Sequence, residues 1–86
     1  MDRRRLLRRL LQGALHNIGF GDMISLMEGF GFTLDRVSGS HHIFLHPDVP
    51  ELLNLQNVNG EAKPYQIRQF LKLVERYNLQ LKDDGP

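Results

Sequence analysis

Apolar positions along the chain follow a helical period near both ends and alternate with polar positions in the middle. Over residues 2–15, leucines recur at helical spacing with arginines on the opposite side, which predicts an amphipathic helix. A second helix is predicted over about residues 22–28 by apolar side chains at i, i+3, i+4 and i+7, which are Met23, Leu26, Met27 and Phe30. Pro64 opens a third helix to about residue 77, and its predicted buried stripe is Ile67, Phe70, Leu71 and Val74.

The middle of the chain predicts strands. Residues 32–38 and 41–46 alternate or carry β-branched and aromatic side chains, and Gly39-Ser40 between them predicts a tight turn, so we expect a hairpin. Residues 47–50 are predicted to be a loop and residues 52–58 a third strand, followed by an Asn59-Gly60 turn. The predicted fold is α+β: a three-stranded antiparallel sheet with helices on one face, plus an extra N-terminal helix.

The length allows one domain with a modest core. We divide the chain into an N-terminal amphipathic helix (1–18), the α-β-β-β-α domain (19–80) and a disordered tail (81–86). The side chains expected to meet in the core are Leu26, Phe30, Leu34, Phe44, Phe70 and Val74. Because the apolar stripe of the N-terminal helix is long for a domain already closed by two helices, we expect that helix to pack on a neighbouring chain in a homo-oligomer.

Charge and composition exclude several classes of function. The chain has no cysteine, which excludes disulfides, thiolate catalysis and thiolate metal sites. No apolar run reaches the roughly 20 residues that span a bilayer, so we expect a cytoplasmic protein with no membrane partner. Contact of the basic face of the N-terminal helix with a polyanion or a membrane surface stays open as an alternative to packing of that helix. The net charge is +1, but residues 1–9 carry five arginines and one aspartate, which leaves residues 10–86 at −3. Attraction to polyanions is therefore concentrated in the N-terminal helix, and the acidic remainder counts against a strong general nucleic-acid binder.

Three of the four histidines lie in the second predicted strand. Because side chains alternate along a strand, His42, Phe44 and His46 share one face, and His41, Ile43 and Leu45 share the other. The large aromatic side chain places the first set toward the core, which leaves His41 exposed on the open face. Imidazole has a reference pKa of about 6.5, so an exposed histidine is suited to general acid–base chemistry.

The same geometry argues against a metal site or a cofactor. His41 and His42 point to opposite faces, and His42 and His46 are roughly 13 Å apart along an extended strand, so neither pair can hold one ion. Ser40 and His41 also point to opposite faces, which does not suit a serine nucleophile with a histidine base. No glycine-rich loop precedes a helix as phosphate binding requires.

One stretch of the chain, residues 31–47, carries a recognisable order of motifs: Gly31-Phe32, a strand, Gly-Ser-His-His at residues 39–42, and His46-Pro47. This order resembles the signature of the HicA-type toxins (the YcfA-like family). Lys63-Pro64 before the last helix also matches. The resemblance covers roughly residues 22–79. It implies a double-stranded-RNA-binding-like fold, an mRNA interferase of a type II toxin–antitoxin system that cleaves RNA without a metal, and neutralisation by a HicB-type antitoxin.

The family's catalytic histidine falls on His41, which we expect to act as the general base. For RNA contact we predict Gly39, Ser40, Arg36 and Lys63, with Arg36 or Lys63 stabilising the charge on the reacting phosphate. The alternative is a catalytically silent protein- or RNA-binding module with the same fold, in which Ile43 and Leu45 form an apolar patch. Basic side chains gathered around His41 would favour the enzyme, and an apolar patch would favour the module.

Overall fold

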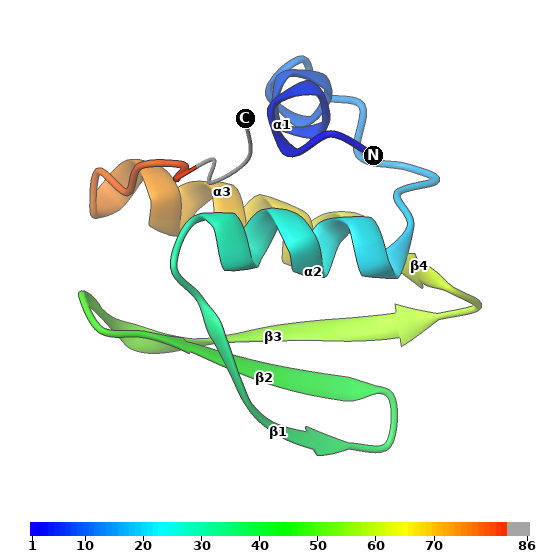
Figure 1. Cartoon of the computed structure of the whole chain (residues 1–86). Helices are drawn as coiled ribbons and strands as arrows, with labels where there is room; N and C mark the ends of the chain where they lie inside the picture. Colours follow the sequence, from blue (N-terminus) through cyan, green and yellow to red (C-terminus); the bar gives the residue numbers. More distant parts are fainter. Residues whose placement is uncertain (83–86) are drawn as a thin grey trace.

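The computed structural model describes residues 1–82, which form three helices and a four-stranded antiparallel sheet in the order β1-β2-β3-β4 (Figure 1). The elements in chain order are α1 (Arg3–Leu11), α2 (Phe20–Gly29), β1 (Thr33–Ser38), β2 (His41–His46), β3 (Val49–Val58), β4 (Glu61–Ala62) and α3 (Pro64–Arg76). Helices α2 and α3 cover one face of the sheet, and α1 lies on the far side of these two helices (Figure 1). The other face of the sheet is open.

The helix ends follow from local chemistry. The Asp2 side chain accepts a hydrogen bond from the Arg4 backbone N–H at 3.0 Å and so caps α1. Asp22 lies in the first turn of α2, and Pro64 occupies the first turn of α3. The predicted extension of the first helix to residue 15 is wrong, because α1 ends at Leu11 and the chain turns at Gly13 with φ +89°.

The sheet departs from the prediction at both ends of β3. The predicted four-residue loop at 47–50 is reduced to a two-residue turn, so β3 begins at Val49. A fourth strand, β4, pairs with the end of β3 across the Asn59-Gly60 turn, so the predicted three-stranded sheet is wrong by one short strand. Asn59 and Gly60 have φ of +53° and +83°, the pair of positive values that a two-residue hairpin turn requires. The Asn-Gly signal therefore marks a hairpin.

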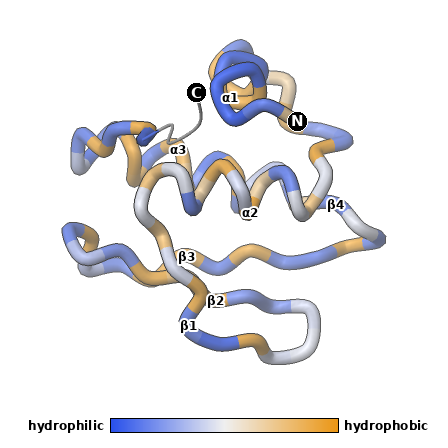
Figure 2. Tube along the Cα trace, in the orientation of Figure 1, coloured by the Kyte–Doolittle hydropathy of each residue, from blue (hydrophilic) through white to orange (hydrophobic). Residues whose placement is uncertain are grey.

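The core lies between the sheet and the helices, and four of its expected members are buried there: Leu26, Phe30, Phe44 and Phe70. Val74 is partly buried and packs against this core. Hydrophobic and hydrophilic residues alternate along β3, whose Leu53 and Leu55 face the helices (Figure 2). The prediction for Leu34 is wrong, because its side chain is 49% exposed. Leu34 pairs with Phe44 and so shares its face, but β1 is the edge strand and all six of its residues are exposed.

Helix α1 packs on α2 of its own chain. Leu6 and Leu10 are buried in the common core, and Arg3 donates a hydrogen bond to the Ser25 hydroxyl at 3.1 Å. The prediction that the apolar stripe packs on a neighbouring chain is therefore wrong for Leu6 and Leu10. Leu11 remains 67% exposed.

The segment that follows α3 returns to the other two helices. Of the predicted tail at 81–86, Leu81 is partly buried against the core and the Lys82 N–H donates to the Gly29 carbonyl at 2.8 Å. Residues 83–86 lie outside the described residues. Among residues 1–82, no helix has the length and apolar character needed to cross a membrane.

Candidate functional site

The register of the sheet fixes which histidine faces the helices. His42 pairs with Leu55 and Phe44 with Leu53, and these side chains point toward α2 and α3. The His42 ring meets the Phe20 ring of α2 edge to face, with the centroids 4.7 Å apart. His41 lies on the opposite face and is exposed, as the alternation predicts.

The open face around His41 consists of cross-strand rows. In one row His41 lies between Ser38 of β1 and Gln56 of β3, and in the next Ile43 lies between Arg36 and Asn54. Arg36 and Asn54 are therefore the diagonal neighbours of His41, at a Cα separation of roughly 7–8 Å. Apolar side chains follow farther along the strands, where Leu45 and Leu52 are exposed.

The His41 imidazole contacts the Asn54 side-chain amide. Its Nδ1 lies 3.0 Å from the Asn54 Nδ2 and 3.3 Å from the Asn54 Oδ1. This leaves Nε2, the outer ring nitrogen, directed away from the contact. Asn54 was not among the residues that we expected at the site. Asn54 alternates with the buried Leu53 and Leu55 along β3 and so lies on the open face, and the register with β2 brings it next to His41.

The Gly39-Ser40 turn sets the start of β2. Gly39 has φ +59°, and a Cβ added there would meet nothing within 4 Å, so glycine is required for its backbone conformation rather than for space. The Ser40 carbonyl accepts the Asn57 N–H at 2.9 Å and a hydrogen bond from the His42 Nδ1 at 3.2 Å. The Ser40 carbonyl therefore joins the turn to β3 and orients the His42 ring.

His46, the third histidine of this strand, has a structural role. Its Nε2 donates to the Phe30 carbonyl at 2.9 Å, and its Nδ1 accepts the Asp48 N–H at 3.0 Å. Its ring also meets the Phe32 ring at 5.0 Å between centroids. Both ring nitrogens are engaged, so neither can act on a substrate. A Cβ at Gly31 would lie 2.9 Å from His46 Nε2, which accounts for the glycine before Phe32.

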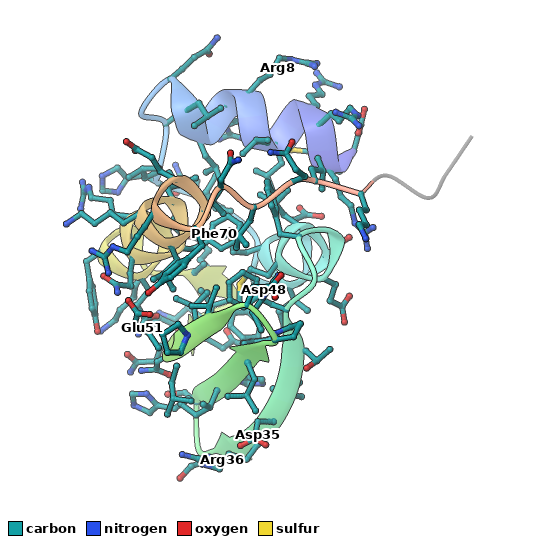
Figure 3. All side chains as sticks on the ribbon, turned by 90° about the vertical axis from the view of Figure 1, so that its left-hand side faces the viewer. Arg8, Asp35, Arg36, Asp48, Glu51 and Phe70 are labelled. Atoms are coloured by element: carbon teal, nitrogen blue, oxygen red, sulfur yellow. The ribbon has the colours of Figure 1, made fainter. Side chains whose placement is uncertain are left out.

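The predicted basic residues lie at different distances from His41. Arg36 shares its face, and its guanidinium is paired with the Asp35 carboxylate at 2.7 Å. Lys63 precedes α3, and its Nζ lies 5.8 Å from the centroid of the Tyr65 ring. The arginines of α1 are remote, since Figure 3 shows Arg8 and Arg36 at opposite ends of the molecule.

A shallow depression of about 240 Å³ lies beside Asn54. It is lined by β3 and the beginning of α3 through the residues Leu52, Asn54, Tyr65, Gln66 and Gln69. Asn54 therefore contacts His41 and also lines this depression. Tyr65, whose ring lies beneath the Lys63 Nζ, lines the same depression.

Metal-ligating side chains do not gather at the site. Within residues 1–82, no three histidine, aspartate or glutamate side chains are close enough to hold one ion. Among residues 1–82, the acidic side chain with a clear pKa shift is Glu51 of β3, which lies away from His41 (Figure 3). The Tyr77 hydroxyl donates to Glu51 at 2.5 Å and Arg76 donates to it at 2.7 Å, and both bonds lower the pKa of Glu51. The bond to the Glu51 carboxylate raises the pKa of Tyr77. This contact joins the end of α3 to the sheet.

Residues 20–75 match the family model of the HicA toxin of bacterial toxin–antitoxin systems. The chain belongs to the HicA toxin family. The match confirms the resemblance seen in the Gly-Ser-His-His and His-Pro motifs, and it begins at α2, so α1 precedes the matched region. Membership in a toxin–antitoxin family implies an antitoxin partner. No curated protein and no solved structure matches the chain significantly.

Proposed function

We propose that the protein is the toxin of a type II toxin–antitoxin system and cleaves mRNA as a metal-independent endoribonuclease. The observation that carries this proposal is the position of His41. It is the family-motif histidine that is exposed on the open face of the sheet, whereas His42 packs on Phe20 and His46 is engaged at both nitrogens.

The proposed reaction is an internal transesterification. His41 takes the proton from a ribose 2′-OH, and the 2′-oxygen forms a bond to the adjacent phosphorus. The bond between phosphorus and the 5′-oxygen of the next nucleotide breaks, and that oxygen gains a proton. The products are a 2′,3′-cyclic phosphate and a 5′-hydroxyl end, with no metal or cofactor required. General-base catalysis of this kind contributes roughly 10²–10⁴-fold.

The RNA would lie along the open face. Arg36, diagonal to His41, and Lys63, beside the depression that Asn54 lines, are the proposed sources of positive charge toward the phosphate. Gly39 and Ser40 are proposed to let the backbone of the turn approach the RNA, because no side chain fills the space at Gly39. The α1 arginines are too remote to supply charge to the same phosphate (Figure 3).

The finer assignments of fold and partner belong to the same proposal. Residues 20–76 form a helix, then antiparallel strands, then a second helix, and both helices lie on one face of the sheet. This order supports a double-stranded-RNA-binding-like fold. We infer a HicB-like protein as the antitoxin and the cytoplasm, where mRNA is found, as the site of action. A homo-oligomer through α1 would use its remaining surface, which is Leu11 and the groove of about 570 Å³ between α1 and α3.

The second candidate is a silent binding module. It is favoured by Leu45 and Leu52, which are 37% and 52% exposed on the same face as His41. The direct cross-strand neighbours of His41 are Ser38 and Gln56, which are uncharged. On this face of the described strands, Arg36 is the one basic residue beside His41, whereas the enzyme would be favoured by several. Such a module would present these leucines to a protein partner.

The two candidates predict different results for purified protein with a long single-stranded RNA in EDTA. The enzyme yields fragments that end in a 2′,3′-cyclic phosphate. It does not cleave the same strand made with 2′-deoxyribose, because the nucleophile is then missing. Uncut RNA with well-folded protein would contradict the enzyme and support the module. Cleavage of the deoxy strand would contradict the transesterification route.

A further inference from the structure

The three histidines of β2 differ in what holds their ring nitrogens. A neutral imidazole carries one N–H, and the nitrogen that carries it is set by the partner of the other nitrogen. For His42 the partner is the Ser40 carbonyl, which only accepts, so Nδ1 must carry the proton. For His46 the Phe30 carbonyl accepts from Nε2 and the Asp48 N–H donates to Nδ1, so Nε2 carries the proton.

His41 has a partner that allows both tautomers. The Asn54 amide can donate from Nδ2, which lies 3.0 Å from Nδ1, or accept at Oδ1, which lies 3.3 Å away. If Asn54 donates, Nδ1 is unprotonated and the outer Nε2 carries the proton. If Asn54 accepts, Nδ1 carries the proton and Nε2 presents a lone pair on the open face. The orientation of this one amide therefore decides whether His41 offers a base or an acid to a ligand.

The nearer amide atom in the structure is Nδ2, and a half-turn about the Cβ–Cγ bond of Asn54 exchanges Nδ2 and Oδ1 at nearly the same positions. We propose that Asn54 is a positioning residue that takes this turned orientation, accepts Nδ1–H of His41 through its Oδ1 and thereby keeps Nε2 free as the base. The inference rests on the proposed ribonuclease function for its role, but the tautomer itself is a property of the folded protein without RNA. An acceptor is also the arrangement that remains satisfied after proton uptake, because the imidazolium carries an N–H at both nitrogens.

Strand geometry makes Asn54 suited to this role. Asn54 is the diagonal cross-strand neighbour of His41, so two paired strands rather than a loop set the distance between the two side chains. The Asn54 side chain is half-buried beside the depression lined by Tyr65 and Gln69, whereas His41 is exposed. The more restricted side chain thus orients the more mobile one.

Gln56 provides a matched control. It is the direct cross-strand partner of His41 on the same face, and its backbone N–H is bonded to the Gln66 side chain at 2.7 Å. Among the described contacts, its side chain makes no hydrogen bond to the His41 ring. Gln56→Leu therefore changes the same face and the same strand without removing the hydrogen bond that we propose to matter.

The test is two-bond ¹H–¹⁵N correlation NMR of the histidine rings at about pH 8, without RNA. We expect His41 of the wild type and of Gln56→Leu to be protonated at Nδ1. In Asn54→Leu we expect Nε2–H to dominate, as it does for free histidine in water. His42 and His46 serve as internal references, with Nδ1–H and Nε2–H respectively. Predominant Nε2–H at His41 in the wild type, or no change in Asn54→Leu, would overturn the proposal.

Kinetics connect the tautomer to cleavage. Asn54→Leu should lower kcat by about tenfold with little change in KM, because a net hydrogen bond of ordinary strength is lost without an RNA contact. Asn54→Asp should retain activity but shift the pH–rate profile to higher pH, because a carboxylate favours the imidazolium. If wild type shows Nδ1–H at His41 and cleaves no RNA, the proposed function fails while the positioning contact stands. Active Asn54→Leu with unchanged kcat would overturn the positioning role.

Discussion

Replacing Gly31 with alanine tests the account of the Gly-Phe and His-Pro motifs. Gly31 has φ +98°, and an added Cβ would lie 2.9 Å from Nε2 and 3.3 Å from Cδ2 of His46. The ring has little freedom to retreat, because both its nitrogens are hydrogen-bonded and it packs on Phe32. Gly31→Ala therefore adds backbone strain and also displaces His46.

The magnitude follows from three contributions. A non-glycine residue in this region costs about 1–3 kcal/mol. Loss of the hydrogen bond from His46 to the Phe30 carbonyl costs about 0.5–1.5 kcal/mol. The lower entropy of the unfolded alanine chain offsets about 0.4–1 kcal/mol. We expect Gly31→Ala to lower the free energy of unfolding by about 2 kcal/mol.

The assay is urea unfolding of four proteins: the wild type, Gly31→Ala, His46→Ala and the double variant that carries both changes. Once the His46 ring is removed, Gly31→Ala adds only backbone strain. The double variant should therefore lose about 1 kcal/mol less unfolding free energy than the sum of the losses in the two single variants. A Gly31→Ala protein within about 0.5 kcal/mol of wild type, or strictly additive costs, would refute the proposed contact.

Two further predictions concern α1 and the end of α3. Leu6→Ala should lower the free energy of unfolding by about 2–5 kcal/mol because Leu6 is 1% exposed. Leu11→Ala changes a side chain that is 67% exposed and should lower it by less than about 0.5 kcal/mol. Equal losses for the two variants in urea unfolding would contradict packing of α1 within the chain. The hydrogen bond from Tyr77 lowers the pKa of Glu51 in the folded protein below the ordinary value of 4.5. The ionised Glu51 therefore stabilises the folded protein above pH 4.5, and this stabilisation is lost as the pH falls through the pKa of Glu51 in the folded protein. The difference in unfolding free energy between wild type and Glu51→Gln should therefore shrink on acidification, and a difference independent of pH would contradict the contact.

The β2 strand could be predicted from its sequence because its alternation and its turn agree. A single large aromatic side chain, Phe44, marks the buried face, and Gly39 permits the tight turn. The exposed position of His41 follows from these two features alone, and the structure confirms it.

The errors arise where burial depends on distant elements. Alternation places Leu34 on the same face as Phe44 but does not tell that the helices leave an edge strand uncovered. The buried face of α3 includes Gln66, a polar residue that a hydrophobic pattern would leave out. Gln66 is buried because its side chain accepts a hydrogen bond from the Gln56 N–H, which the short strand β4 leaves unpaired. Asn54 could be placed on the open face, but its contact with His41 requires the register of β2 and β3.

The most direct test of the general-base assignment compares His41→Ala and His42→Ala in RNA cleavage and in urea unfolding, with EDTA present. His41 is exposed, so His41→Ala should change the free energy of unfolding by less than about 0.5 kcal/mol and yet abolish nearly all cleavage. His42→Ala removes a ring that packs on Phe20 and should cost about 1–2 kcal/mol, with activity falling only as the fold loosens. Equal cleavage by wild type and His41→Ala would contradict the assignment of His41 as the base.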